Sequence, residues 1–498
     1  MLENINQLQA VRHEKLQKLI ALGVNPYPNR VNRTHRIVEL WDRRDDFTAS
    51  EQKVIITGRI DAIRRQGKVG FGNICDQSGR IQIFVKQDLV GEESYEIFKL
   101  LDLGDIIQVQ GKCFVTRMGE YSLRVQDIVL LSKNLRPLPV VKQQVVDGIQ
   151  KRYDEFVDIE LRYRKRYLDL LLNPEVKRNF EIRALIISEI RKFLNEEGFL
   201  EVETPVLQPL YGGAYARPFI THHNTLDIDL YLRIALELYL KRLLIGNMEK
   251  VYEIGKNFRN EGMDRNHNPE FSMVEIYQAY TDYSGMMDLT EAMITGLARK
   301  INGREEVRFQ DRVIELERPW KRASMIDLIR EKTGYDAADF DFARISAYCS
   351  EHDIEIPPGA GPGKLIEAIF ARFVEAELIE PTFVIDFPSE ISPLAKHKPG
   401  NTKLVERFEL FINGNEYGNA FTELNDPVDQ RQRFEAQAEL RKMGDLEANP
   451  VDEDFLEALE YGMPPAGGLG IGIDRLVMLF TNNTSIKEVI LFPTMKPE

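Results

Sequence analysis

The chain has 498 residues, which is long enough for two or three domains with large hydrophobic cores. Its formal net charge of -14 argues against a protein that is basic throughout and coats nucleic acid by charge alone. The acidic excess lies after residue 150, so the mildly basic first part can still contact nucleic acid through local patches.

The cysteines lie far apart in the sequence and form no Cys-x-x-Cys pair: Cys75, Cys113 and Cys349. This spacing argues against a disulfide framework or a cysteine-rich zinc site, and it favours free thiols in a reducing compartment. The N-terminus lacks the apolar core of a signal peptide, and no stretch is apolar enough for a transmembrane span. We therefore expect a soluble cytoplasmic protein without a membrane partner.

An N-terminal helical extension is expected over residues 1–50. Apolar residues recur at helical spacing between residues 4 and 22, and Gly23 and Pro26 then end the pattern. Five strand-like runs follow, separated by turn residues such as Ser78-Gly79. The runs are Val54–Ile63, Val69–Cys75, Arg80–Val85, Ile106–Phe114 and Tyr121–Leu131.

These five runs, with a helical break at Ser94–Leu101 between the third and the fourth, predict an OB-type β-barrel over residues 51–135. In the third run, apolar residues at 81, 83 and 85 alternate with Gln82 and Phe84. Because side chains alternate across a strand, one set must face the barrel core and the other must face outward.

A linker is expected over residues 136–160, since Leu135–Pro139 has the composition of an extended segment. The basic segment Arg162–Tyr167 follows, and it could be a solvated helix face or a contact for RNA or another subunit. Asn179–Asn195 has the apolar spacing of an amphipathic helix that ends at Gly198, and Phe199–Val202 then extends as a strand.

A sheet domain is expected over residues 161–498. Its periodicity turns helical at about residues 320–380, which predicts a helical insertion between two halves of the sheet. Within the sheet, the stretch Glu270–Tyr280 places Phe271, Glu275 and Tyr277 on one strand face. An aromatic ring, a carboxylate and a phenol make a poor hydrophobic core but a good pocket floor, whereas a solvent-facing edge would not explain Phe271.

Asn413-Gly414 is a strong hairpin signal between two further strand-like runs. A two-residue turn there places Glu409 and Glu416 on one face and close together. Two carboxylates across strands repel unless they share a partner, so we expect them to hold a hard cation. Asn419 and Glu423 have the opposite parity, and a bulge at Gly418 would turn both into the same cavity.

Two separated segments complete a phosphate-binding signature: Phe258-Arg259-Asn260-Glu261, and the glycine-rich run Gly468–Arg475. An arginine fork matches phosphate oxygens bidentately. Glycines on one strand face let a flat nucleotide approach the backbone closely. The sequence therefore predicts a nucleoside triphosphate site that does not use a P-loop.

These segments resemble the signature motifs of class II aminoacyl-tRNA synthetases, and the chain resembles the bacterial-type lysyl-tRNA synthetase family from end to end. Additional matching segments occur in order: Gly212–Ala214, Ala216–Asn224, Leu232–Ala235, His267–Phe271 and Ser392–Leu394. The chain departs from the family at Leu236, where proline is usual, and at Tyr215, where a small residue is usual. Neither departure removes a functional group.

The resemblance implies an α+β fold: an N-terminal OB-fold β-barrel that reads the anticodon, and a class II antiparallel-sheet catalytic domain with a helical insertion. It implies ATP-dependent attachment of L-lysine to tRNA(Lys) through a lysyl-adenylate, with release of AMP and pyrophosphate. It also implies Mg2+ as cofactor and a homodimer whose interface is built by Asn179–Asn195 and the strand that ends at Pro205.

The resemblance also assigns residues on the nucleotide side. Arg259 would hold the α-phosphate and the lysine carboxylate, and Arg475 would lie near the γ-phosphate, so both are catalytic. ATP would further contact Glu261, His267 and Phe271, the last by stacking on adenine. Glu409 and Glu416 would bind the magnesium that bridges the triphosphate.

The remaining assignments concern the amino acid and the tRNA. Gly213 and Glu237 would hold the α-amino group of lysine, and Asn419 would lie near its carboxylate. Its ε-ammonium would be received by Glu275, Tyr277 and Glu423. The anticodon-reading positions of the barrel would be Phe71, Gln82 and Glu120.

Three alternatives compete with this reading. An aspartyl or asparaginyl synthetase shares the OB domain and the motifs, but its pocket needs a cation where this chain has Glu275 and Glu423. A lysine-activating paralogue that modifies a protein lacks the OB module. An RNA-binding regulator would have no need to keep Arg259, Glu409, Glu416 and Arg475 together.

Overall fold

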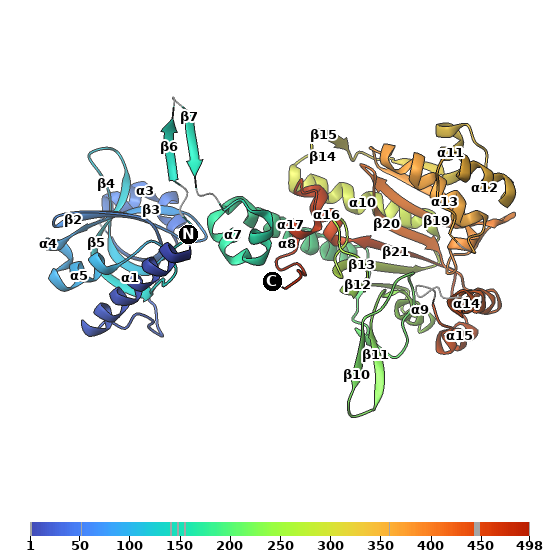
Figure 1. The fold of residues 1–498 in the computed structure, drawn as a ribbon, viewed down its shortest axis with the longest axis horizontal. Helices are drawn as coiled ribbons and strands as arrows, with labels where there is room; N and C mark the ends of the chain where they lie inside the picture. The colour runs from blue at the N-terminus through green and yellow to red at the C-terminus, as the bar shows by residue number, and fades with distance from the viewer. Residues whose placement is uncertain are drawn as a thin grey trace. The chain divides into compact units, whose positions relative to one another are not determined.

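The structure, a computed structural model, describes residues 2–50, 52–139, 142–146, 149–153, 156–357, 359–442 and 449–497. The chain folds into two units, Met1–Phe156 and Val157–Glu498 (Figure 1). Each unit has its own hydrophobic core. Among the described residues, none of the helices has the length and apolar character needed to cross a bilayer.

The first unit is built around a closed barrel of strand order β1-β2-β3-β5-β4, in which only β3 and β5 pair in parallel. Each of the five strand-like runs predicted between residues 54 and 131 forms one barrel strand, so the predicted OB-type fold is present. Its strands are β1 (Lys53–Gln66), β2 (Val69–Cys75), β3 (Arg80–Lys86), β4 (Ile106–Val115) and β5 (Tyr121–Ser132). Its helices are α1 (Leu2–Ala21), α2 (Ile37–Asp42), α3 (Arg44–Ser50), α4 (Gln87–Val90) and α5 (Glu92–Leu100).

Strand β3 alternates as predicted. Ile81, Ile83 and Val85 are buried, while Gln82 and Phe84 lie half-buried on the outer surface. The inner cluster also takes in residues of α1, α3 and α5, so these helices pack against the barrel. On the outer surface, the Phe84 ring packs between those of Phe71 and Phe114.

The predicted linker contains a separate antiparallel ribbon of two strands, β6 (Lys142–Val146) and β7 (Ile149–Tyr153). We did not predict these strands, because their sequences are mostly polar and carry no alternation of apolar and polar residues.

The second unit contains the large sheet and most of the helices. Its helices are α6 (Ile159–Arg164), α7 (Arg166–Leu172), α8 (Pro174–Glu196), α9 (Glu237–Ile245), α10 (Tyr283–Asn302), α11 (Met325–Thr333), α12 (Phe342–Glu351), α13 (Pro362–Phe373), α14 (Pro427–Lys442), α15 (Glu453–Glu460), α16 (Ile473–Phe480) and α17 (Ile486–Val489), with short 3-10 turns at Glu375–Glu377 and Ser389–Ile391. Its strands are β8 (Leu200–Glu201), β9 (Leu207–Gln208), β10 (Ile220–His223), β11 (Ile228–Leu232), β12 (Lys250–Phe258), β13 (Glu270–Ala279), β14 (Glu306–Phe309), β15 (Arg312–Glu315), β16 (Lys321–Ser324), β17 (Thr382–Pro388), β18 (His397–Lys398), β19 (Asn401–Ile412), β20 (Asn415–Thr422) and β21 (Ala466–Gly472).

In the described residues of this unit, nine strands form one sheet of order β16-β17-β19-β20-β21-β13-β12-β8, with β18 paired to β19. The strands from β17 to β12 are antiparallel to their neighbours, as predicted for a class II catalytic sheet, and only the outermost pairs are parallel. The centre of the sheet therefore brings together β19, β20, β21 and β13, which come from distant parts of the sequence.

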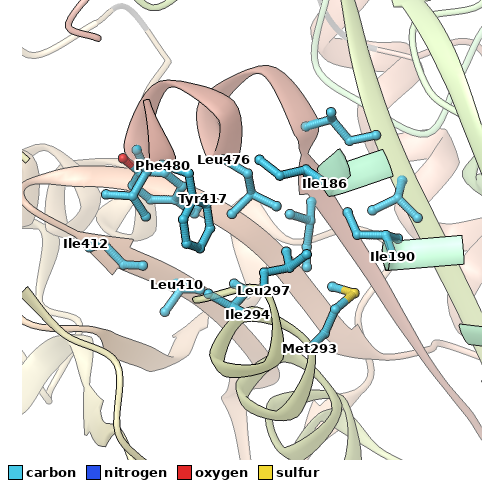
Figure 2. Close-up of a cluster of buried hydrophobic side chains, with 14 of the residues drawn as sticks. Ile186, Ile190, Met293, Ile294, Leu297, Leu410, Ile412, Tyr417, Leu476 and Phe480 are labelled. Carbon is cyan, nitrogen blue, oxygen red and sulfur yellow. The ribbon is translucent and has the colours of Figure 1, made fainter. Parts of the chain in front are cut away.

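One face of this sheet is apolar and is covered by α8, α10 and α16. Figure 2 shows their side chains turned toward those of β19 and β20 in one buried cluster. The labelled members are Ile186 and Ile190 of α8, Met293, Ile294 and Leu297 of α10, Leu410 and Ile412 of β19, Tyr417 of β20, and Leu476 and Phe480 of α16. Strand residues next to these in sequence must point to the opposite face.

The helical insertion predicted at about 320–380 forms α11, α12 and α13 after the short strand β16. Its apolar cluster includes Ile345 and Ile369 from the helices, and Val384 and Phe411 from β17 and β19. The insertion therefore packs on the β17–β19 end of the sheet, and Phe411 shows that it lies on the face away from α10.

The basic segment Arg162–Tyr167 is divided between α6 and α7. Arg166 is fully buried: it forms an ion pair with Asp169 and donates to the carbonyls of Lys487 and Leu491. It ties α7 to the C-terminal segment, so this arginine has a structural role rather than lying on a solvated helix face. Tyr167 is exposed.

Candidate active site

The site occupies the sheet face opposite to α8, α10 and α16. On β13, Val274 and Ile276 belong to the cluster beneath the helices. Glu275 and Tyr277 therefore point to the other face, as the alternation in the sequence predicted. The neighbouring strand β21 pairs Gly470 with Glu275 and Gly468 with Tyr277, so only backbone separates β13 from β20 along this face.

On this face of the sheet, the glycines of β21 form a strip without side chains between β13 and β20, which we call the trough. Gly470 lies between Glu275 and Asn419, and Gly468 lies between Tyr277 and Phe421. A Cβ atom on Gly468 would lie 1.9 Å from Glu423 Oε1 and 2.5 Å from the Tyr277 ring. A larger residue at this position would displace both side chains, so glycine is required for them to converge.

The β19–β20 hairpin brings the other acids into the trough through a bulge. Phe411 pairs with Glu416, but the register then shifts, and Leu410 pairs with Gly418. The bulge that the sequence predicted near Gly418 is therefore confirmed, with Tyr417 as the extra residue. Beyond the bulge, Asn419 pairs with Glu409. The side chains of Asn419 and Glu423 therefore lie on the same face of the sheet as those of Glu409 and Glu416, as predicted.

Arg259, at the end of β12, is set to receive an anion. Its guanidinium lies 5.0 Å from the centre of the Phe271 ring, and its buried Nε has no hydrogen-bond partner among the described residues. Burial lowers the pKa of Arg259, and the negative charges of Glu261 and Glu416 oppose that shift. A buried guanidinium N–H without a partner is costly, and a phosphate or carboxylate would relieve that cost.

The loop between β12 and β13 carries the other residues assigned to ATP. The backbone of Arg259 donates to the carbonyl of Pro269 at 2.9 Å, which closes the loop at its base. Glu261 Oε1 accepts a bond of 3.4 Å from the backbone of Arg217. His267 lies at the exposed side of the loop, where its Nδ1 is 2.8 Å from a carboxylate oxygen of Asp264.

Arg475 follows β21 at the start of α16 and lies at the same end of the trough as Arg259 and the β19–β20 hairpin. Its Nη1 donates to the Glu416 carbonyl at 2.5 Å and to the Glu416 carboxylate at 3.2 Å. Its Nη2 lies 3.4 Å from His267 Nε2. The structure therefore brings together the two arginines, the loop histidine and the acidic hairpin that the sequence placed far apart.

A cavity of about 220 Å³ lies beside this hairpin and is lined mainly by oxygen-bearing side chains. Burial raises the pKa of Glu409 to about 8, and the negative charges of Glu416 and Glu367 add to this shift. Arg407 opposes the shift, because its Nη2 lies 2.6 Å from the Glu409 carboxylate. The lining residues are Asn266, Glu375, Glu409, Phe411, Gly414, Asn415, Glu416 and Arg475.

This oxygen-rich lining fits a hard divalent cation. Within the described part of the chain, no group of three or more His, Cys, Asp or Glu side chains is arranged to hold a metal unaided. A pair of carboxylates is nevertheless what magnesium uses when substrate phosphates supply its other ligands. The residues present therefore fit an ion that enters with a triphosphate.

The other end of the trough is an acidic pocket with a lysine of the chain inside it. Glu237, Glu275 and Glu423 are buried there, together with Tyr277 and Lys241. Lys241 Nζ lies 2.5 Å from Glu237 and 2.5 Å from Glu423. The Tyr277 hydroxyl donates to Glu275 at 3.2 Å.

Burial shifts these acids strongly. It raises the pKa of Glu275 to about 7, an effect that the charge of Glu237 reinforces. It raises the pKa of Glu423 to about 8, although the ammonium of Lys241 opposes the shift. Buried carboxylates with raised pKa values favour a bound cation, because a cation restores the charged form.

Two backbone features shape this pocket. Gly213 has a φ of +86°, and a Cβ atom there would lie 3.2 Å from the Glu237 Cβ, so the loop packs closely on that side chain. The backbone of Leu236 donates to Glu275 at 3.3 Å. Leu236, which stands where the family usually has proline, therefore donates a hydrogen bond that proline could not donate. Tyr215, the other departure, accepts a hydrogen bond from Gln437 of α14.

The barrel presents a separate aromatic surface. Phe71 is 39% exposed, and its ring lies 5.1 Å from Phe84, the residue opposite it on β3. Ser122 donates to the side chain of Gln82 at 2.8 Å and to the carbonyl of Glu120 at 3.3 Å. The three predicted anticodon residues thus lie on adjoining strands or turns, around rings that could stack on bases.

The sequence did not reveal Lys241 and Arg407. Arg407 donates to Asn419 at 3.1 Å and to Glu409 at 2.6 Å, and so it orients two assigned residues. Its position two residues before Glu409 on one strand face was an available signal. For Lys241, the signal was its spacing of four residues from Glu237 within an apolar helical stretch.

The comparisons with known proteins agree with this geometry. Residues 158–496 match the family model for tRNA synthetases class II (D, K and N), and residues 54–131 match the model for the OB-fold nucleic acid binding domain. Fold and site together define a class II aminoacyl-tRNA synthetase.

Relatives named lysine–tRNA ligase match the chain over nearly its whole length. The one from Carboxydothermus hydrogenoformans is 51% identical, over 99% of both chains. The one from Moorella thermoacetica is 52% identical, over 100% of this chain and 99% of its own. The one from Staphylococcus epidermidis is 50% identical, over 100% of both. The chain belongs to the lysine–tRNA ligase family.

Proposed function

We propose that the chain attaches L-lysine to tRNA(Lys) in two steps, with ATP consumed and AMP and pyrophosphate released. The observation that carries this proposal is the acidic pocket of Glu237, Glu275 and Glu423 at one end of the trough that holds Arg259. A substrate with two ammonium groups and one carboxylate matches these charges. An aspartyl or asparaginyl substrate would instead place its side chain against buried acids.

In the first step, a carboxylate oxygen of lysine attacks the α-phosphorus of ATP, and the bond from that phosphorus to the β-phosphate oxygen breaks. The attacking carboxylate is already ionised, so the protein needs no nucleophile of its own. Arg259 would neutralise the α-phosphate, and Phe271 would stack on adenine. The Arg259 guanidinium lies 5.0 Å from the centre of the Phe271 ring, which supports placing both residues in one site. Arg475 would hold the far end of the triphosphate, so catalysis rests on positioning and charge neutralisation.

Magnesium is the cofactor that we propose, held by Glu409 and Glu416. When bound with ATP, it would neutralise charge on the triphosphate. The oxygen-lined cavity beside both carboxylates supports this assignment.

In the second step, a hydroxyl of the terminal ribose of tRNA attacks the carbonyl of the lysyl-adenylate, and AMP leaves. We propose that the barrel selects the tRNA through Phe71, Gln82 and Glu120. The exposed ring of Phe71 beside Phe84 supports stacking of an anticodon base.

We further propose that the chain acts as a homodimer in the cytoplasm, with an interface that includes Asn179–Asn195 and the strand that ends at Pro205. The small sheet β10-β11-β9, which follows that strand in the sequence, leaves apolar side chains exposed, among them Leu207, Ile220 and Ile228, and such side chains favour a protein interface. Sedimentation of the purified chain tests the dimer, and fractionation of cells tests the location.

The test of the function is ATP–pyrophosphate exchange with lysine and with aspartate, followed by charging of tRNA(Lys). We expect exchange and charging with lysine alone. Exchange with aspartate would identify an aspartyl-type enzyme. Absence of exchange with either amino acid would identify an RNA-binding protein without the activity.

A further inference from the structure

Lys241 is the feature of the pocket that the proposed function does not use. Its side chain is wholly buried, although it is a lysine on a helix, and it lies 5.3 Å from the centre of the Phe421 ring. Its ammonium contacts one oxygen of Glu237, on the same helix, and one oxygen of Glu423, beyond the end of β20. It therefore joins two acids that come from distant parts of the sequence.

Each of these acids has a second oxygen that Lys241 does not hold. Glu423 Oε1 lies beside Gly468 and the Tyr277 ring. Neither oxygen of Glu423 has a hydrogen-bond partner among the described residues, and Lys241 lies next to Oε2 only, in the ion pair. Glu237 Oε2 lies toward Gly213, 3.8 Å from where a Cβ atom of that glycine would stand. The free oxygens therefore face the two ends of the pocket that were assigned to the ε-ammonium and the α-amino group.

The number of charges in the pocket also matches a substrate with two ammonium groups. Glu237, Glu275 and Glu423 carry three negative charges when ionised, and Lys241 balances one of them. Although burial disfavours its charge, Glu237 and Glu423 raise the pKa of Lys241, so it remains an ammonium. Arg407 also acts on Glu237, but it is paired with Glu409. Two negative charges therefore remain, which is the number of ammonium groups on the substrate. The substrate carboxylate is left for Arg259.

We propose that Lys241 is a positioning residue that fixes the spacing of Glu237 and Glu423, so that their free oxygens match two ammonium groups separated by the length of a lysine side chain. The inference rests on the proposed function, because it concerns the same pocket. It predicts that Lys241 contributes to the rejection of ornithine, which is one methylene shorter, as well as to the affinity for lysine.

The test is Lys241→Met, which keeps the length of the side chain and removes its charge. In ATP–pyrophosphate exchange, we expect the KM for lysine to rise on the order of 100-fold, as for loss of one partner of a buried ion pair. We expect the preference for lysine over ornithine to fall by about tenfold or more. The KM for ATP should stay within about twofold, because Lys241 contacts no residue assigned to ATP.

Two further variants make the outcome decisive. Leu240→Met changes a buried residue on the same helix and should leave the KM for lysine unchanged. Lys241→Arg keeps the charge but moves the donors, so it should alter the preference for lysine over ornithine. If Lys241→Met does not fold, Lys241→Arg decides the question.

The inference is overturned if the lysine-to-ornithine preference of the folded variants equals that of the unaltered protein. It is also overturned if Lys241→Met raises the KM values for lysine and ATP equally, since that result describes a purely structural residue. Failure of the unaltered protein to exchange with lysine would overturn the proposed function instead.

Discussion

Arg475 and Glu416 are bonded to each other twice: Arg475 Nη1 donates to the Glu416 carbonyl at 2.5 Å and to its carboxylate at 3.2 Å. One of these residues is assigned to the γ-phosphate and the other to magnesium. On the proposed assignments, we expect the carboxylate to turn from the arginine to the ion when ATP and magnesium bind, while the bond to the carbonyl remains.

The first prediction concerns this metal site. Glu416→Gln keeps the shape of the side chain but removes the charge that a hard cation prefers, and Glu409→Gln does the same. In each variant, the magnesium concentration for half-maximal exchange should rise by about tenfold or more. Titration of magnesium at fixed ATP measures this concentration, and Glu439→Gln, at an exposed position, is the control. Unchanged titrations in both site variants would leave these residues as a structural charge cluster.

A second prediction separates the two units by activity. Phe71→Ala should weaken the charging of tRNA(Lys) by roughly 1–3 kcal/mol through loss of base stacking. Exchange without tRNA should stay close to that of the unaltered protein. Phe342→Ala removes a similarly exposed ring from α12 and should affect neither reaction. If Phe71→Ala abolished lysine-dependent exchange while the barrel stayed folded, the assignment of the barrel to tRNA would be wrong.

Much of this architecture was predictable because a strand alternates with a period of two. The barrel strands, the face shared by Glu275 and Tyr277, and the bulge near Gly418 all followed from alternation and turn signals. These features depend on residues close together in the sequence. The roles of individual site residues came only from the resemblance, and they remain predictions.

What the sequence could not reveal depends on contacts across the fold. Lys241 follows Glu237 by four residues in an apolar helical stretch, but its second partner, Glu423, is distant in the sequence. Arg166 belongs to a basic segment, yet it is buried against carbonyls more than 300 residues later in the chain. Neither of these long-range contacts can be read from local periodicity.

The third prediction concerns pH. Burial raises the pKa of Glu275 to about 7 and that of Glu423 to about 8, so at lower pH the empty pocket is partly protonated. An ammonium favours the ionised acids, and lysine binding must therefore release protons. The KM for lysine should fall as pH rises from about 6 to about 8, because the acids of the pocket lose their protons over this range while the ε-ammonium of the substrate stays charged. A KM that does not change over this range would contradict the proposed contacts.

Leu236→Pro tests directly how Glu275 contributes to the pH dependence of the KM for lysine. The backbone N–H of Leu236 donates to Glu275 at 3.3 Å and lowers its pKa against the effect of burial. Proline removes this donor, so the pKa of Glu275 should rise and the pH dependence should move to higher pH. Leu236→Ala keeps the donor and should leave the profile in place. Exchange assays across the pH range, with proton release measured by calorimetry in two buffers, distinguish these variants.

The last prediction concerns specificity for the ε-ammonium. Glu423→Gln keeps the shape of a fully buried side chain but removes its charge, and it leaves a bound ammonium poorly compensated. The expected cost to lysine binding is about 3–5 kcal/mol, as for breaking a buried ion pair. The KM for ATP should barely change, because the proposed phosphate and adenine contacts are Arg259, Arg475 and Phe271.

Gly468→Ala is the matched steric variant, because it leaves every charge in place. Its added Cβ would meet Glu423 Oε1 at 1.9 Å and the Tyr277 ring at 2.5 Å, so it must push both away from the substrate. We therefore expect it to raise the KM for lysine as well, but without the loss of charge that Glu423→Gln causes. Exchange at varied lysine and varied ATP measures both variants. Equal increases in the two KM values would show that the lysine pocket lies elsewhere and that Glu423 only supports the fold.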